Sequence, residues 1–336
     1  MTTYLLVDTA NTFFRARHVA HRGMDSWTRL GFAMHVTMAA VNKAWRIAGA
    51  DHVVFALEGR SWRKDYYKPY KANRKVAREA LTEQQQEEDQ LFWDTYDDLT
   101  TFLKEQSNCS VLRCDIAEAD DIIARWIHKH KDDEHVIVSS DTDFVQLVSD
   151  NVKQYNGIQN HMITIDGIFD DYGKRVKDKK TGEDKEIPNP AWLLFEKCMR
   201  GDATDNVFSA YPGVRKKGTK NKVGLLEAFD DRGSKGYNWN NMMLQRWTDH
   251  NGEEHRVLDD YNRNVTLVDL TAQPSELKEY IDNTMTDQLV CKNNPMVGAK
   301  FLKFCGKYEL KRIAEEATKY AEWLQRGYDV QSPTHS

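Results

Sequence analysis

Acidic residues recur in this sequence where apolar segments end. Asp8 follows the segment YLLV, and Glu58 follows VVFAL. The set of acids in or near such places is Asp8, Glu58, Glu118, Asp120, Asp121, Asp141, Asp143, Asp202 and Asp205. If the apolar segments are parallel strands, most of these carboxylates converge at the edge where such sheets bind ligands.

Convergence of this many carboxylates requires cations. Two carboxylates about 4 Å apart repel by roughly 4 kcal/mol at an effective dielectric constant near 20. Mg²⁺ and Mn²⁺ are the natural counter-ions for an all-oxygen site. Two such ions about 3.5–4 Å apart suit phosphodiester hydrolysis, because one activates a water and both stabilise charge on the attacking and leaving oxygens. The sequence therefore predicts a site for two divalent cations.

Each acid taken singly also has a structural explanation. Glu118 and Asp121 can complement the dipole of a helix that they open, and Asp141 can be an ordinary N-cap. Turns and caps, however, do not require acids at four separate strand ends. The whole set therefore favours a metal site.

A basic, aromatic segment follows Glu58 directly. Residues Arg60–Arg78 read RSWRKDYYKPYKANRKVAR, with eight Lys or Arg residues and one acid, Asp65. The cations can neutralise phosphates, and the interleaved aromatic rings can stack on unpaired bases. The alternative is a solvated basic helix with buried tyrosines.

A second basic stretch, Gly213–Gly224, reads GVRKKGTKNKVG. Its glycines permit close approach to phosphates, and the start of the following helix favours an anion. A basic surface loop would look similar. Histidines give no zinc pattern, since there is no H-E-x-x-H.

The overall composition restricts the class of protein. The chain has 336 residues, a net charge of -5 and 40% hydrophobic residues. A mean hydropathy of -0.71 and the lack of a long apolar run exclude a spanning helix. The N-terminus does not resemble a signal peptide. Five scattered cysteines without a C-x-x-C pair fit reduced thiols, so we expect a cytoplasmic protein.

Apolar periodicity predicts elements that would position these residues. Short apolar segments at 4–7, 53–57, 111–112 and 136–138 read as strands, and helical spacing recurs between them. Such alternation predicts an α/β fold with a central, mostly parallel sheet flanked by helices. An apolar stripe from Leu310 to Leu324 reads as core packing rather than a docking surface. The final residues, 331–336, are expected to be disordered.

Several motifs together resemble the 5′-nuclease superfamily, which includes flap endonucleases, the 5′-exonuclease domains of bacterial polymerases and phage RNase H enzymes. The matching segments are LLVDTAN, WRKDYYKPYKANR, AEADDIIA, VSSDTDFVQL and RGDATDNV, in the family's order across roughly residues 4–230. The phage RNase H branch is the most similar. The resemblance implies a metal-dependent 5′-3′ exonuclease or flap endonuclease that acts on DNA flaps or RNA primers in replication.

The resemblance also implies roles for single residues. A first metal would be held by Asp8, Glu58, Glu118 and Asp120, and a second by Asp120, Asp141, Asp143 and Asp202. Asp121 and Asp205 would support these ligands. Lys71 and Arg74 would contact the scissile phosphate, and Tyr70 would lie near the unpaired nucleotide. The further nucleic-acid contacts would come from Arg63, Lys64, Arg78, Arg215, Lys216, Lys217, Lys220 and Lys222.

Two regions would carry substrate. A helical arch at about 60–97 would pass the 5′ strand, and Gly213–Gly224 would form a helix–three-turn–helix that binds duplex phosphates, often with K⁺. The predicted division is a nuclease core at 1–200 and a helical duplex-binding region at 201–336. Two positions depart from the family pattern: Glu58 stands where the family usually has Asp, and the turn differs from the usual G-x-G-x-K form, which puts K⁺ binding in question.

Other hydrolase classes fit less well. A haloacid-dehalogenase-like phosphatase needs a second Asp where this chain has Ala10, and a DEDD-type exonuclease needs D-x-E in its first strand. A PIN-type ribonuclease shares the acidic edge but lacks an extended basic arch. A non-catalytic, structure-specific nucleic-acid-binding protein is a second alternative. The sequence also leaves open whether a sliding clamp or a single-strand-binding protein is a partner. It does not decide between exonuclease and endonuclease action, or between RNA and DNA.

Overall fold

The computed structural model describes residues 1–19 and 25–329, so the expected disorder of residues 331–336 concerns a segment outside the described part of the chain. The molecule divides into two compact units. Unit 1 comprises Met1–Arg60, Leu81–Pro188 and Glu276–Ser336, and unit 2 comprises Ser61–Ala80 and Asn189–Ser275. The functional division at residue 200 into a nuclease core and a duplex-binding region stays a prediction.

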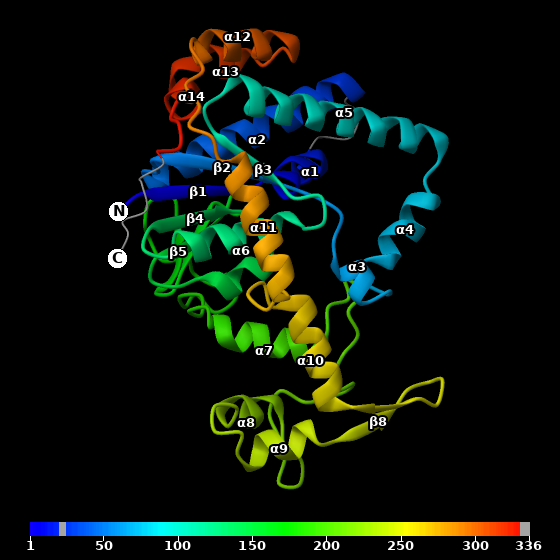
Figure 1. Ribbon diagram of the computed structural model, residues 1–336. Coiled ribbons are helices and arrows are strands. Elements are labelled where there is room, and N and C mark those ends of the chain that lie inside the picture. Colours follow the sequence, from blue (N-terminus) through cyan, green and yellow to red (C-terminus); the bar gives the residue numbers. More distant parts are fainter. Residues whose placement is uncertain (20–24, 330–336) are drawn as a thin grey trace. The chain divides into compact units, whose positions relative to one another are not determined.

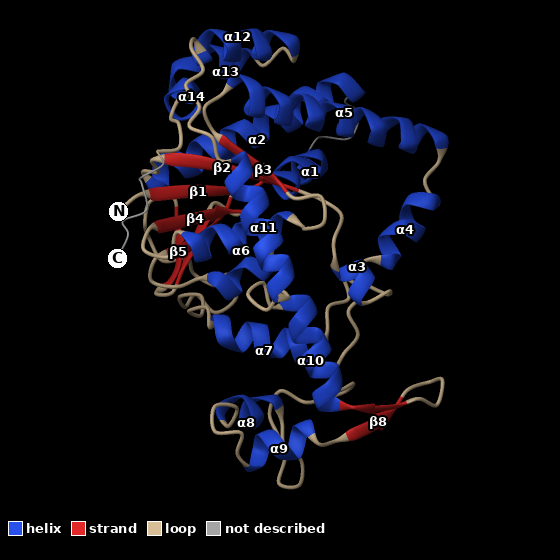
Figure 2. Ribbon diagram, in the orientation of Figure 1, coloured by secondary structure: helices blue, strands red, loops and turns tan. Residues whose placement is uncertain are grey.

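Unit 1 is built on a seven-stranded sheet with the strand order β3-β2-β1-β4-β5-β6-β7 (Figures 1 and 2). Its strands are β1 (Thr3–Asp8), β2 (His52–Leu57), β3 (Ser110–Arg113), β4 (Glu134–Val138), β5 (Val152–Asn156), β6 (His161–Thr164) and β7 (Gly167–Asp170). The first five pair in parallel, and the last two are antiparallel. The predicted mostly parallel sheet flanked by helices is confirmed.

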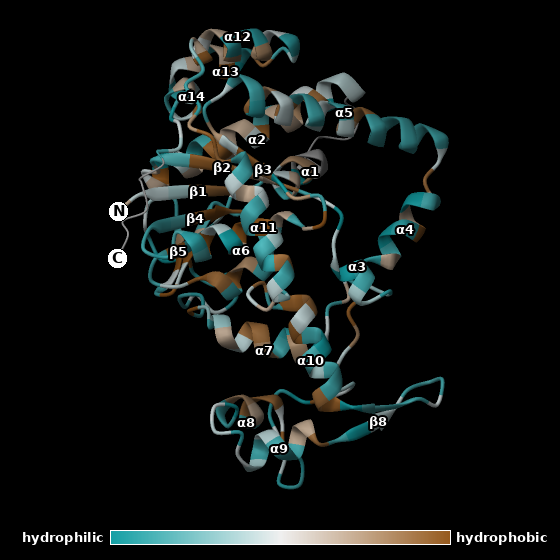
Figure 3. Cartoon of the chain, in the orientation of Figure 1, coloured by the Kyte–Doolittle hydropathy of each residue, from teal (hydrophilic) through white to brown (hydrophobic). Residues whose placement is uncertain are grey.

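Helices cover both faces of this sheet. They are α1 (Thr9–Val19), α2 (Ser26–Ala48), α5 (Glu83–Gln106), α6 (Ala119–Lys129), the 3-10 helix η1 (Thr142–Leu147), α11 (Ser275–Gln288), α12 (Val297–Lys307), α13 (Lys311–Glu315) and α14 (Ala317–Leu324). Because side chains alternate across a strand, Leu5 and Val7 join the core with α2, α5, α12 and α14. Tyr4 faces the other way and packs on Trp126 of α6, with ring centroids 5.1 Å apart. In Figure 3 the strands carry more of the hydrophobic colour than the exposed N-terminal half of α5 does.

Local capping sets the ends of the long helices. The Asp25 side chain accepts a hydrogen bond from the Thr28 backbone at the start of α2, and Gly49 ends that helix in the left-handed conformation, at φ 60°. Thr82 and Gln85 form a capping box at the start of α5. These caps satisfy backbone groups that the helix itself leaves unpaired.

The C-terminal segment completes the core of unit 1. Leu310, Ile313, Ala317, Tyr320 and Leu324 are all buried there, so the apolar stripe is core packing, as predicted. It forms two short helices that meet at Glu316 rather than one helix. On the other face of the sheet, Arg125 of α6 donates two hydrogen bonds, of 2.8 and 2.6 Å, to the carboxylate of Asp282 in α11.

Unit 2 is mainly helical. It contains α3 (Arg63–Tyr66), α4 (Ala72–Glu79), α7 (Pro190–Arg200), α8 (Leu225–Asp230), α9 (Tyr237–Met243), the hairpin β8 (Arg246–Thr248) and β9 (Glu254–Arg256), and α10 (Val257–Val268). One hydrophobic cluster joins α7, α8, α9 and α10. A second brings Tyr70 together with Cys198, Val207, Leu267 and Val268. The basic segment is therefore anchored by its tyrosine.

All five cysteines lie in the described residues, where none is joined in a disulfide, and four of them are buried. Among the described helices, none combines the length and apolar character needed to cross a bilayer.

Candidate active site

The register of the parallel strands brings acidic residues to one edge of the sheet. Asp8 ends β1 opposite Ala56 of β2, so Glu58 lies just beyond the same level. Val7 pairs with Val138 of β4, which places Ser139 beside Asp8. The Ser139 hydroxyl donates to Asp8 Oδ2 at 2.9 Å, and the Asn11 backbone N–H donates to Oδ1 at 3.2 Å. Asp8 is thus a buried and oriented carboxylate.

The loop after β4 continues this hydrogen-bonded edge. The Asp141 N–H donates to Ser139 Oγ at 3.1 Å, and Asp141 Oδ1 accepts from the Asp143 N–H at 3.0 Å, which caps η1. Gln154 Nε2 donates to the carbonyl oxygens of Ser139 and Asp141, at 3.0 and 2.6 Å. The N-cap explanation for Asp141 therefore applies, and the same contacts also hold the loop beside Asp8.

Glu58 is tied to the start of α6. Its Oε2 accepts a hydrogen bond from the Ala119 N–H at 3.3 Å. Asp121 Oδ2 accepts from the Glu118 N–H at 3.1 Å, and Asp121 is fully buried. Asp121 thereby stabilises the start of the helix, while Glu118 and Asp120 stand on either side of Ala119. The direct hydrogen bond to Ala119 shows how the longer Glu58 side chain is held at this edge.

The charges of Glu58 and Asp8 act on one common neighbour. Burial, followed by the negative charges of Glu58 and Asp8, raises the pKa of Tyr96 well above its ordinary value. The two carboxylates thus act on the same buried hydroxyl. The structure thus brings β1, β2, β4 and the start of α6 together with their acids.

This donor set fits hard divalent cations. Asp8 and Glu118 are 3% and 6% exposed, and Glu58, Asp120, Asp141 and Asp143 are half-buried. Carboxylates in such surroundings are stabilised by pairing or by a metal, and oxygen ligands suit Mg²⁺ and Mn²⁺. The identity of each ligand stays a prediction.

Gly59 tests how closely this site is packed. A Cβ at Gly59 would lie 1.9 Å from the Cys114 carbonyl oxygen and 2.7 Å from that of Ala117, both backbone atoms. We expect Gly59→Ala to displace the strand end that carries Glu58, to destabilise the protein by about 1–3 kcal/mol and to weaken Mn²⁺ binding. Urea unfolding and Mn²⁺ titration measure the two effects. Gly233→Ala is the control, because nothing lies within 4 Å of its added Cβ; equal stability and metal affinity in both variants would contradict the prediction.

In unit 2, the Asp205 carboxylate contacts three residues of the basic segment Arg60–Arg78. It accepts hydrogen bonds from the Tyr70 hydroxyl at 3.0 Å and from Arg74 at 2.7 Å. Lys71 Nζ lies 3.5 Å from the same carboxylate, and the Lys71 N–H donates to the Asp205 carbonyl oxygen. Lys71 itself has a left-handed backbone, with φ 54°. Asp205 therefore positions the three residues that were expected to contact substrate.

Asp202 is paired in a similar way within unit 2. Its carboxylate lies 2.8 Å from Lys197 Nζ. Burial raises the pKa of Asp202, but Lys197 and the backbone N–H groups of Thr204 and Asp205 outweigh that effect and lower it. Asp202 and Asp205 thus have basic side chains as close neighbours. Their expected contribution to a metal site stays a prediction.

The remaining basic residues fall into two groups. Arg63 is 1% exposed and donates to the Leu267 carbonyl oxygen at 2.7 Å, so a phosphate contact would require it to leave this position. The exposed ones are Lys64, Arg74, Arg78, Arg215, Lys216, Lys217, Lys220 and Lys222. They are available to a polyanion.

The turn Gly213–Gly224 is stabilised from within. The Glu227 carboxylate accepts hydrogen bonds from the N–H groups of Gly218 and Gly224, at 3.0 Å each. A Cβ at Gly224 would lie 2.3 Å from the Gly218 nitrogen, so the two glycines allow the chain to close on itself. The expectation that the helix start here favours an external anion needs correction, because the N–H groups of Leu225 and Leu226 already donate to the carbonyl oxygens of Arg215 and Lys216. Phosphate contacts would come from the exposed lysines and Arg215.

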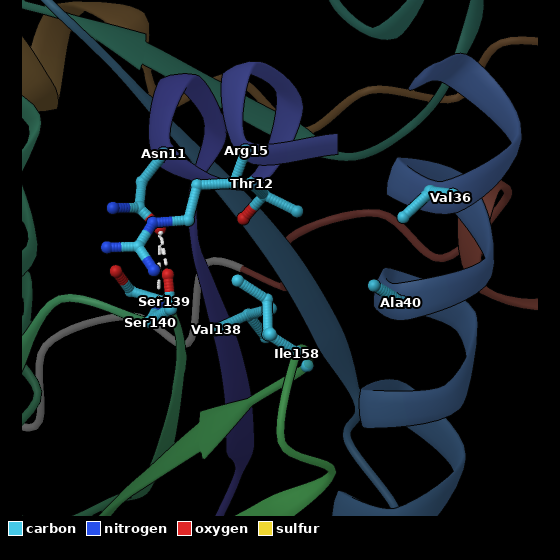
Figure 4. A pocket seen from close by; sticks show the side chains of 10 residues that line it. Asn11, Thr12, Arg15, Val36, Ala40, Val138, Ser139, Ser140 and Ile158 are labelled. Atoms are coloured by element: carbon cyan, nitrogen blue, oxygen red, sulfur yellow. Dashed lines mark hydrogen bonds between the residues drawn. The ribbon is translucent and has the colours of Figure 1, made fainter. Parts of the chain in front are cut away.

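A small pocket of about 50 Å³ lies beside the Asp8 edge (Figure 4). Asn11 and Arg15 of α1 point toward Ser139 and Ser140, while Val36 and Ala40 of α2 form the opposite wall. Ser140 donates to Asn11 Oδ1 through its hydroxyl at 2.8 Å and its N–H at 3.2 Å. The pocket thus has a polar wall next to the carboxylates and an apolar wall facing it.

The sequence analysis did not single out Asp249, Glu253 and His255 in the β8–β9 hairpin, whose ligand atoms all lie within 4.8 Å of one another. Asp249 accepts the N–H groups of Asn251 and Glu253, at 2.9 and 2.8 Å. His255 stacks on Trp247 and contacts Asp260. We therefore assign these side chains to the hairpin turn.

Comparison with known proteins agrees with this architecture. The family described as "5′-3′ exonuclease, N-terminal resolvase-like domain" matches residues 3–173. A DNA polymerase I of Rhizobium leguminosarum is 31% identical over 174 residues, covering 50% of this chain and 14% of that protein. A 5′-3′ exonuclease of Buchnera aphidicola (subsp. Schizaphis graminum) is 32% identical over 116 residues, covering 34% of each. This chain therefore spans well under two thirds of these relatives.

Solved structures share the fold. A bacteriophage T5 5′-exonuclease with bound divalent metal ions (zinc) has a TM-score of 0.58 at 18% identity, covering 85% of this chain and 98% of that one. A T5 flap endonuclease in a pseudo-enzyme-product complex with DNA and metal ions has a TM-score of 0.54 at 18% identity, covering 95% and 99%. Because the family model matches residues 3–173, the chain belongs to the 5′-3′ exonuclease family with an N-terminal resolvase-like domain.

Proposed function

We propose that the chain is a divalent-metal-dependent 5′-3′ exonuclease and flap endonuclease that hydrolyses phosphodiesters near the 5′ ends of DNA flaps or RNA primers during replication. The observation that carries the proposal is the hydrogen-bonded acidic edge of unit 1. There Asp8 is held by Ser139, and Glu58 by the start of α6. Family membership and the metal ions in the related T5 structures support it.

Each group of residues has a part in this reaction. Asp8, Glu58, Glu118 and Asp120 would hold one divalent cation, and Asp120, Asp141, Asp143 and Asp202 a second. When bound, the cations supply an activated water and stabilise charge on the phosphate oxygens. Asp121 keeps the start of α6 in place, and Asp205 holds Lys71 and Arg74, whose charges would stabilise the phosphate in the transition state. Tyr70 packs in a hydrophobic cluster with Val207 and anchors this segment.

Substrate binding would use the exposed basic residues. The arch at about 60–97 would carry the single strand, and Gly213–Gly224 would contact duplex phosphates. The T5 complex with DNA supports a DNA substrate. The proposal includes a K⁺ ion bound at the turn and a cytoplasmic location. It also includes a sliding clamp or a single-strand-binding protein as a partner. The buried Leu310–Leu324 stripe is not available to such a partner.

A flap substrate labelled at either end tests the proposal. With Mg²⁺ and a 5′ label, we expect short labelled products, while the remaining strand gains a new 5′ phosphate, and EDTA should abolish both. A substrate labelled at its 3′ end should release its label only after extensive digestion. Degradation that starts at the 3′ end, or activity that survives EDTA, would refute the proposal. Binding without cleavage would instead indicate a non-catalytic nucleic-acid-binding protein.

Lys71→Ala separates chemistry from binding. Because one phosphate-stabilising donor typically contributes 10²–10³-fold to the rate, we expect kcat to fall by roughly 100-fold and Kd for flap DNA to change by less than about fivefold. Lys75→Ala is the matched control, since Lys75 lies on α4, the helix that follows Lys71, and its Nζ is 3.8 Å from the Glu79 carboxylate. A single-turnover rate equal to that of the unmodified protein would remove Lys71 from the chemistry.

A further inference from the structure

Tyr96 carries a polar group that its surroundings do not satisfy. The residue lies in the middle of α5 and is 5% exposed. Its hydroxyl oxygen is buried and has no hydrogen-bond partner among the described residues. A buried tyrosine hydroxyl normally finds a partner, and leaving one unmatched costs about 1–3 kcal/mol. In a native structure, an unmatched group of this kind points to a water or ion that completes it.

The ring of Tyr96 is held in one place by other aromatic side chains. Its centroid lies 5.5 Å from that of Phe13, 5.7 Å from Phe14 and 5.8 Å from Trp93. Phe13 and Phe14 belong to α1, which begins directly after Asp8. A ring packed on several sides cannot swing its hydroxyl elsewhere. A water molecule or an ion would therefore have to bind beside the hydroxyl to give it a partner.

The neighbourhood of the hydroxyl is acidic. Of all charged groups, Glu58 and then Asp8 have the largest effect on Tyr96, and together with burial they raise its pKa. The hydroxyl therefore keeps its proton throughout the physiological pH range. Phe13 and Phe14, which pack on the Tyr96 ring, belong to the helix that begins directly after Asp8, one of the carboxylates that would hold the first cation in the proposed function.

We propose that Tyr96 is a positioning residue for the divalent cation, and that its hydroxyl accepts a hydrogen bond from a water molecule of the cation's shell that Glu58 and Asp8 also help to hold. A water bound to a divalent cation is a strong donor with two protons. One proton can reach a carboxylate and the other the Tyr96 oxygen. The water thereby satisfies the buried hydroxyl, and the hydroxyl orients the water.

This inference rests on the proposed function, since it requires a cation at the acidic edge. It also adds to that function, because it gives α5 a part in the metal site. The acids of the sequence motifs all come from other elements. It predicts that removing one oxygen atom from Tyr96 weakens metal binding without weakening the fold.

Tyr96→Phe is the direct test. The change keeps the ring and its contacts with Phe13, Phe14 and Trp93, and removes only the hydroxyl. Loss of an outer partner of a metal site typically lowers metal affinity 10–100-fold, so we expect at least about a tenfold rise in the Kd for Mn²⁺ by isothermal titration calorimetry without DNA. In EDTA the melting temperature should be unchanged or higher, because an unmatched buried group has gone. Tyr320→Phe is the control, as Tyr320 is a buried tyrosine packed on Phe301 in the C-terminal helices.

The outcomes separate this inference from the proposed function. If the unmodified protein binds Mn²⁺ and Tyr96→Phe binds it equally well, the role of Tyr96 is refuted while the nuclease proposal stands. If Tyr96→Phe melts lower in EDTA and its affinity loss is matched by Tyr320→Phe, the hydroxyl is structural and the inference is also refuted. If the unmodified protein binds no Mn²⁺, the metal-dependent function itself fails.

Discussion

Replacing Asp120 by asparagine is expected to abolish metal-dependent cleavage and to leave DNA binding nearly unchanged. Asp120 lies in the first turn of α6, directly after Ala119, whose N–H holds Glu58. In the proposed function Asp120 is a shared ligand of both cations. Asparagine keeps the shape of the side chain but removes its charge, so binding of the second cation should suffer most. We expect kcat to fall by roughly 1000-fold, which corresponds to about 4 kcal/mol of transition-state stabilisation.

A matched variant shows whether the effect is local. Asp132 is an exposed acid in the turn between α6 and β4, so Asp132→Asn removes the same charge before the amino end of β4 rather than at the carboxyl ends of the strands. Its cleavage rate should stay within about twofold of that of the unmodified protein. Single-turnover cleavage and fluorescence anisotropy with flap DNA measure rate and binding separately. Residual cleavage above about one tenth in Asp120→Asn would contradict a shared ligand.

Acidification is expected to destabilise unit 1 through two buried histidines. Burial lowers the pKa of both His52 and His135 to about 4. The unfolded chain takes up a proton on each near pH 6.5, but the folded protein takes it up only near pH 4. Between these values the unfolded state binds more protons, so stability falls as the pH falls. At 1.36 kcal/mol per pKa unit, each histidine costs about 3 kcal/mol at pH 4.

The surroundings of His135 make it the better one to replace. It is fully buried in β4, stacks on Tyr4 at 5.8 Å, and neither ring nitrogen has a hydrogen-bond partner among the described residues. His135→Phe keeps a ring that does not titrate, so urea unfolding between pH 7 and pH 4 should show a smaller loss of stability by about 3 kcal/mol. His128→Gln, at an exposed position on α6, should leave the loss unchanged. An identical pH dependence in all three proteins would show that His135 does not control acid stability.

The parallel strands were predictable because each is a short apolar segment buried on both faces. β1, β2, β3 and β4 all lie where apolar segments indicated them, within one or two residues. β5 to β7 were not predicted, since VKQYN and HMIT mix polar with apolar residues and are only partly buried. The break between α13 and α14 was also missed, because neither glycine nor proline marks Glu316.

The acidic edge was predictable from spacing alone, because strand ends in a parallel sheet share one edge. Long-range pairing was not. Arg74 meets Asp205 from 131 residues away, and no local pattern indicates which acid a given cation meets. No sequence motif marks Tyr96 either, because its importance comes from a hydroxyl whose surroundings form only when the chain folds.

Anomalous scattering from crystals of the protein grown with Mn²⁺ tests the central claim most directly. We expect the strongest anomalous peak among the carboxylates of Asp8, Glu58, Glu118 and Asp120. Manganese found only at other groups, such as Asp249, Glu253 and His255 of the hairpin, with the strand-end acids free of metal, would contradict the account.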